Sequence, residues 1–167
     1  MGFSRLLLLA LVLAIPAGAH AAAMNAARWS TYANARFGTT ADYPSDVFTR
    51  RDPPPENGDG VAMHTADNRA TLTIFGHYNV ENDTPQSYFD NIVDKDGVTY
   101  KQITKTYYVA SGTRGANIFY ERCNFRKGDM ATVDCFELTY PAAEKAAWDA
   151  IVTRISQSLR AGKGVAD

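Results

Sequence analysis

The sequence is poor in features that identify chemistry. It holds two cysteines among 167 residues, and their spacing is not C-x-x-C, so a redox-active thiol pair is not expected. No G-x-S-x-G motif is present, so nothing supports a serine hydrolase. The formal net charge of −1 provides none of the positive charge with which proteins hold nucleic acid or an anionic membrane.

One long apolar run is present, at the N-terminus. Arg5 precedes an uninterrupted apolar run from Leu6 to Ile15. This run is too short to span a bilayer, which needs about 20 residues. A positive residue, a short apolar run and the small-x-small sequence Ala19-His20-Ala21 are typical of a cleaved export leader. We expect cleavage after Ala21, with Ala23 as the alternative site, and no stable membrane anchor.

The remaining chain predicts one exported domain. A leader over residues 1–21 leaves a single domain over 22–160, a size that supports a hydrophobic core, and a flexible tail over 161–167. In an oxidising compartment, Cys123 and Cys135 would form a disulfide, whose loop of about 13 residues would contribute ~3 kcal/mol of stability. The leader and the cysteine pair together predict a periplasmic or secreted protein.

Alternating apolar residues predict a β-hairpin over 61–78. With Asp67-Asn68 as its two-residue turn, Met63 pairs with Leu72 and the apolar side chains fall on one face. His64 and His77 then lie on the opposite face, about 20 Å apart, so they cannot share one metal ion.

Two helices and further strands are predicted around the hairpin. Thr84 and Pro85 suit the start of a helix that ends before Gly97, and a second helix is expected over 141–159. Strands are expected over 29–43 (a pair), 101–111, 116–125 and 131–140. The predicted fold class is α+β, an antiparallel sheet of about six to seven strands with helices packed on both sides.

The predicted disulfide would fix the register of the last two strands. If Cys123 lies opposite Cys135, then Glu121 lies directly opposite Glu137. A preceding turn over 111–115 would place Lys105 opposite Glu121, so that one cation and two carboxylates form a row across three strands.

This row has two interpretations. The one we favour is a surface row of ion pairs, anchored by Lys105 and contributing less than about 1 kcal/mol. The alternative is a catalytic carboxylate pair, because neighbouring strands are about 4.8 Å apart and two close carboxylates raise one pKa. The candidate catalytic residues are therefore Glu121, Glu137 and Lys105.

A second candidate site is the cluster Glu56-Asn57-Gly58-Asp59-Gly60, which follows three prolines. Glu56, Asn57 and Asp59 offer oxygen atoms and are the candidate binding residues. Asn, Asp and Gly also form turns without any ion, and the cluster lacks the ligand spacing of a calcium loop. We interpret it as the bend before the hairpin and expect no bound metal or cofactor.

Short motifs and the order of elements resemble known proteins. The motifs Tyr32-x-Asn34-x-Arg36-Phe37-Gly38, Tyr43-Pro44 and Asn57-Gly58-Asp59-Gly60 are similar to those of exported bacterial proteins of unassigned function. The element order resembles the PsbP family, extrinsic subunits of the photosynthetic oxygen-evolving complex, although Arg-Phe-Gly departs from that family's Gly-Phe. The resemblance implies an αβα sandwich and a non-enzymatic assembly or binding role, and it carries no catalytic residue over.

The first hypothesis is therefore an exported soluble domain that binds or assists a partner without catalysis. The partner would be another envelope protein or a small ligand, held on a sheet face or on the loop 53–60. The alternative is a small hydrolase that uses Glu121 and Glu137. A minor alternative is a metal-binding protein.

Overall fold

A computed structural model describes residues 27–126 and 131–162, and the predicted leader lies outside these residues. The strands are β1 (Trp29–Ala33), β2 (Thr40–Pro44), β3 (Arg50–Arg51), β4 (Gly60–His64), β5 (Thr71–Tyr78), β6 (Val98–Ile103), β7 (Tyr107–Arg114), β8 (Asn117–Phe125) and β9 (Thr132–Pro141). The helices are α2 (Pro85–Asn91), the 3₁₀ turn η1 (Ala142–Glu144) and α3 (Lys145–Ser158).

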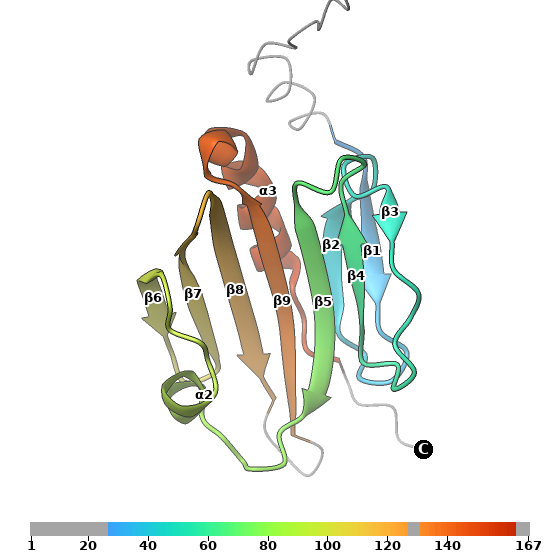
Figure 1. Ribbon diagram of the computed structural model, residues 1–167. Helices are drawn as coiled ribbons and strands as arrows, with labels where there is room; N and C mark the ends of the chain where they lie inside the picture. The colour runs from blue at the N-terminus through green and yellow to red at the C-terminus, as the bar shows by residue number, and fades with distance from the viewer. Residues whose placement is uncertain (1–26, 127–130, 163–167) are drawn as a thin grey trace, which may run out of the picture.

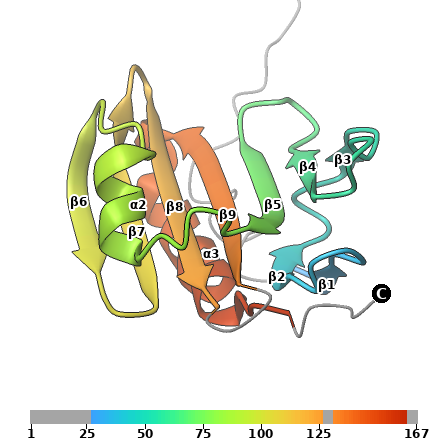
Figure 2. The ribbon, with the colours of Figure 1, turned by 90° about the horizontal axis from the view of Figure 1, so that it is seen from below.

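Strands β3 to β9 form one antiparallel sheet of seven strands, in the order β3-β4-β5-β9-β8-β7-β6, and β1 and β2 form a separate pair. Helix α2 packs on one face of the large sheet, whereas α3 and the β1–β2 pair pack on the other (Figures 1 and 2). The predicted α+β class is confirmed. Within the described residues, no helix has the length and apolar character to cross a membrane.

Strand β9 is buried on both faces, and its side chains divide between two cores. Phe136 and Leu138 pack under α3, whereas Val133 and Cys135 pack under α2. A strand that is apolar on both faces must be covered on both, which is why the sheet needs a layer on each side.

The hairpin and the start of α2 form as the sequence predicts. Met63 pairs with Leu72, and Asn68 takes φ 58° in the turn. Thr84 caps α2 by accepting a hydrogen bond from the Ser87 backbone N–H. Ile92, the residue that follows the end of α2, is 60% exposed, whereas Phe89 within the helix is buried.

The segment predicted as one strand over 101–111 is two strands. β6 ends at Ile103, and β7 then runs on to Arg114, so the next turn holds Gly115 and Ala116. Gly115 takes φ 60°, a conformation that is cheap for glycine and allows this short turn. The turn predicted over 111–115 is therefore wrong, and every pairing between β7 and β8 shifts with it.

The Arg-Phe-Gly motif forms the turn between β1 and β2. The side-chain oxygen of Asn34 accepts hydrogen bonds from the backbone N–H groups of Arg36 and Phe37, over 2.9 and 2.7 Å. Phe37 is buried against Tyr78. A Cβ at Gly76 would lie 2.8 Å from that of Phe37, so the turn can rest on β5 because this position has no side chain.

A buried carboxylate joins the β1–β2 pair to the large sheet. Asp134 in β9 is fully buried and accepts hydrogen bonds from the hydroxyls of Thr39, over 2.5 Å, and Thr132, over 2.8 Å. Burial raises the pKa of Asp134, and the two threonine hydrogen bonds oppose that increase.

Candidate functional site

The residues predicted from the glycine cluster, Glu56, Asn57 and Asp59, lie in the exposed loop between β3 and β4. The side-chain amide of Asn57 donates to Asp59 Oδ2 over 2.7 Å, and the Asn57 carbonyl accepts from Arg36 over 2.6 Å. Across residues 27–126 and 131–162, no group of three or more His, Cys, Asp or Glu side chains is arranged to hold a metal ion. The loop makes the polar contacts of a turn.

The carboxylate pair forms, but without the predicted lysine. Cys123 and Cys135 form the disulfide, and Glu121 lies directly opposite Glu137. Lys105 lies in the turn between β6 and β7, and Ala110 occupies the position opposite Glu121. The predicted row that places Lys105 beside Glu121 is therefore wrong.

Glu121 is half-buried and hydrogen-bonded to the neighbouring strand. The Tyr108 hydroxyl donates to Glu121 Oε1 over 2.5 Å. Burial raises the pKa of Glu121, the Tyr108 hydrogen bond opposes the increase, and the nearby Glu137 adds to it. Burial, followed by Glu121, also raises the pKa of Tyr108. Glu121 therefore holds a proton more readily than an exposed glutamate.

The carboxylate pair lies apart from the cavities described here. Glu121 and Glu137 lie on the sheet face that carries α2, and neither lines any of three cavities on the molecule. Acid–base catalysis requires space for a substrate within hydrogen-bonding reach of the carboxyl group.

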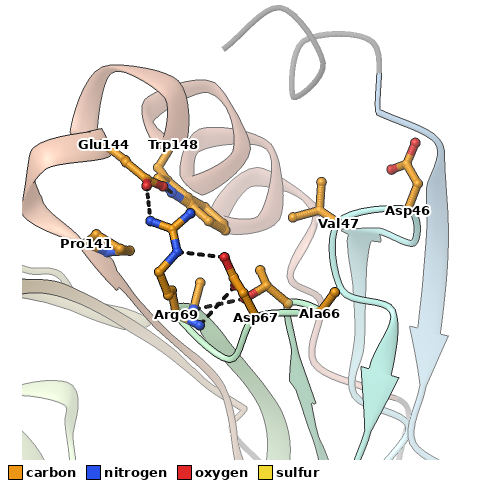
Figure 3. A pocket seen from close by; sticks show the side chains of 10 residues that line it. Asp46, Val47, Ala66, Asp67, Arg69, Pro141, Glu144 and Trp148 are labelled. Atoms are coloured by element: carbon orange, nitrogen blue, oxygen red, sulfur yellow. Dashed lines mark hydrogen bonds and ion pairs between the residues drawn. The ribbon is translucent and has the colours of Figure 1, made fainter. Parts of the chain in front are cut away.

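A pocket of about 330 Å³ opens where the β4–β5 turn meets the start of α3 (Figure 3). Its apolar walls come from three parts of the chain that are distant in the sequence: Val47 after β2, Ala66 in the hairpin turn, and the continuous segment that holds Pro141 and Trp148. A small, mostly apolar cavity with a few fixed polar groups is the usual form of a ligand site.

Arg69 lies between two carboxylates in this pocket (Figure 3). Its Nε–H donates to Asp67 Oδ2 over 2.6 Å, and its Nη1 pairs with Glu144. The Trp148 indole N–H donates to the other oxygen of Glu144 over 3.3 Å. Hydrogen bonds from Thr65 and then Arg69 hold the pKa of Asp67 far below its usual range. The guanidinium of Arg69 is thus held by two carboxylates that balance its charge.

This arrangement determines which ligands the pocket suits. Since Arg69 is matched by Asp67 and Glu144, it is not free to hold an anion. Asp46, which accepts a hydrogen bond from the Arg28 backbone N–H over 3.0 Å and lies 3.9 Å from the Arg28 guanidinium, adds a third acidic side chain to the lining. The apolar walls and the excess of acidic groups favour a small ligand that is uncharged or cationic.

This pocket is not evident from the sequence. Trp148 was not among the candidate site residues predicted from the sequence. Arg69 and Glu144 are 75 residues apart, so no local pattern joins them. The available signals were a predicted turn at Asp67-Asn68 and the acidic Glu144 near the start of the helix. Neither signal shows that the hairpin turn and the helix are in contact.

No protein-family model and no curated protein matches the sequence. Solved structures do match. The solution structure of cyanobacterial PsbP (CyanoP) from Synechocystis sp. PCC 6803 is similar with a TM-score of 0.52 and 11% sequence identity, over 81% of this chain and 93% of that chain. At this identity the similarity concerns the fold alone, and at that level the resemblance to PsbP predicted from the sequence is confirmed.

Proposed function

We propose that this protein is an exported accessory or binding domain without catalytic activity, and that its ligand is held in the pocket of Figure 3. The observation that carries the proposal is the pocket itself, whose lining combines apolar walls with a guanidinium paired to two carboxylates. An arginine whose charge is balanced by two carboxylates suits recognition, because its guanidinium stays protonated and takes no part in proton transfer. The PsbP-like fold supports an accessory role.

Two features support export. The first 21 residues have the composition of a cleaved leader. The disulfide between Cys123 and Cys135 is of a kind that persists in oxidising compartments.

Native mass spectrometry tests the proposal. The full chain is expressed with its own leader in a bacterial host, and the protein of the periplasmic fraction is measured. We expect a polypeptide that begins at residue 22 or 24, with oxidised cysteines, and a non-covalently bound small molecule. Ala66→Trp places an indole in the pocket from an exposed turn position, and it should abolish the bound mass.

Ala146→Trp is the matched control. It introduces the same side chain at an exposed position of α3 that lines none of the three cavities, and it should keep the bound molecule. An unprocessed chain in the cytoplasm would contradict export. A wild-type protein without a bound mass, or an adduct that survives Ala66→Trp, would contradict the assignment of the pocket.

The second candidate function is a hydrolase that uses Glu121 and Glu137, and the raised pKa of Glu121 is the observation that favours it. Its test is the turnover of a panel of glycoside and ester substrates. Loss of turnover in Glu121→Gln at unchanged stability would support the hydrolase. Absence of turnover in the wild type would exclude it for those substrates.

A further inference from the structure

A second concave surface runs along the other flank of α3. The helix lies behind the central strands of the large sheet, whereas β6 extends beyond it at the sheet edge (Figure 1). A groove of about 550 Å³ follows this flank, with the exposed side of α3 as one wall and β6 as the other. Its floor is formed by residues of β7, β8 and the end of β9.

The hydroxyl of Tyr140 faces this groove. Tyr140 is only 3% exposed, and its ring stacks on Trp148 with centroids 5.2 Å apart. Among the described residues the Tyr140 hydroxyl has no hydrogen-bond partner, although no fully buried side-chain oxygen or nitrogen there is left unpaired. The hydroxyl must therefore face the open space of the groove. A buried ring that presents one unpaired donor to a cavity is what a ligand's acceptor would use.

The groove carries no net charge. Lys145 Nζ pairs with the two carboxylate oxygens of Asp149, over 2.7 and 2.9 Å, and these are its only charged lining residues among those described. Burial, followed by Asp149, raises the pKa of Tyr140 to about 12, so its hydroxyl remains a neutral donor. The other polar groups are hydroxyls, and the ring of Tyr100, with 53% of the residue exposed, borders them.

We propose that this groove binds a neutral saccharide. The observations are the unpaired hydroxyl of Tyr140, the exposed ring of Tyr100 and the balanced charge of Lys145 and Asp149. A sugar ring presents an apolar C–H face to an aromatic ring, and its hydroxyls both donate and accept hydrogen bonds. A charged ligand would meet no uncompensated opposite charge here. The site is separate from the pocket of Figure 3, and the proposal does not rest on that pocket.

The test uses the mature protein on an immobilised set of neutral and anionic oligosaccharides, followed by calorimetric titration with the neutral disaccharide that is best retained. Tyr140→Phe removes one hydroxyl and keeps the ring on Trp148, so it should weaken binding at least tenfold without changing the melting temperature. Tyr100→Ala should weaken binding to a similar extent. Tyr107→Phe is the control, because Tyr107 is another tyrosine of the same sheet, half-buried, that does not line the groove.

Three results would overturn the proposal. The first is that no neutral oligosaccharide is retained, or that anionic ones are retained equally well. The second is that Tyr140→Phe binds the disaccharide as tightly as the wild type. The third is that an oligoproline peptide, the other ligand suited to a tyrosine-lined groove, binds instead and loses affinity in Tyr140→Phe.

Discussion

Tyr140 and Trp148 stack on one another with an interplanar angle of 21°, and each lines a different cavity. Trp148 borders the pocket of Figure 3, and Tyr140 borders the groove on the other flank of α3. Tyr140 lies near the end of β9, and η1 leads from there directly into α3. The stacked pair therefore holds the helix on the sheet and forms a wall common to both candidate sites.

Removing this wall should cost much of the stability of the domain. Trp148→Ala deletes a buried indole and its contacts with Tyr140 and Phe48, so we expect a loss of about 3–5 kcal/mol in the free energy of unfolding. Urea denaturation, monitored by circular dichroism, measures this loss in the free energy of unfolding. Trp29→Ala removes an indole that is only partly buried and should cost clearly less. Equal losses in the two variants would contradict this role of Trp148.

The disulfide should stabilise the sheet. Replacing both Cys123 and Cys135 by alanine is expected to lower the free energy of unfolding by ~3 kcal/mol, because the unfolded chain gains the freedom that the closed loop denied it. The measurement is the urea midpoint with and without reductant. Reductant should lower the midpoint of the wild type and leave that of the double variant unchanged. A wild-type midpoint that does not respond to reduction would contradict the prediction.

Glu121 should make stability depend on pH. Its pKa is raised in the folded state above the ordinary value of 4.5, so the native protein binds the proton more tightly than the unfolded chain. Its contribution is therefore complete below pH 4.5 and is lost as the pH rises through the folded pKa. The groups that act on it are Tyr108, Glu137 and Arg114.

Glu121→Gln isolates this effect, because the amide oxygen can still accept from Tyr108. We expect the stability of Glu121→Gln minus that of the wild type to increase with pH above 4.5 and then to become constant. Glu137→Gln should narrow the pH range over which this difference increases, since it removes a negative charge that raises the pKa of Glu121. Urea denaturation at pH values from 4 to 8 measures both; a difference that does not vary with pH would contradict the assignment.

The buried Asp134 should depend on its threonine donors. Thr39→Val removes the hydroxyl that donates to Asp134 and leaves a buried carboxylate with one fewer partner, so we expect a loss of about 1–3 kcal/mol. Thr31→Val is the matched control, because it removes a hydroxyl that donates to the solvent-accessible Asp42, and it should cost less than about 0.5 kcal/mol. Equal costs in chemical denaturation would show that Asp134 does not need this donor.

Some parts of the fold could be predicted from the sequence and others could not. The β4–β5 hairpin and the β8–β9 register were predictable, since a period of two fixes which side chains share a face, and a disulfide between opposite residues removes the remaining freedom. The position of Lys105 was not predictable. A turn centred on 111–115 and a turn at Gly115-Ala116 are both compatible with the glycines of this segment. The two turns give different pairings of β7 with β8, and the pairing decides which residue lies opposite Glu121.

The candidate sites depend on contacts that carry no local pattern. The ring of Tyr140 belongs to the core, but its hydroxyl emerges on the flank that α3 leaves open. Whether a hydroxyl is buried or reaches a groove depends on where a helix lies on the sheet. The pocket at Arg69 likewise requires the hairpin turn and α3 to meet, which only the tertiary structure fixes.

Chemical-shift mapping by NMR tests the central claim of a binding domain most directly. The ¹⁵N-labelled mature protein is titrated with a small-molecule extract of the cells that produce it. We expect shifts of the Trp148 indole N–H and of the backbone around Arg69 and Glu144, in the pocket of Figure 3. Shifts confined to Glu121, Glu137 and their neighbours, or no shifts at all, would contradict it.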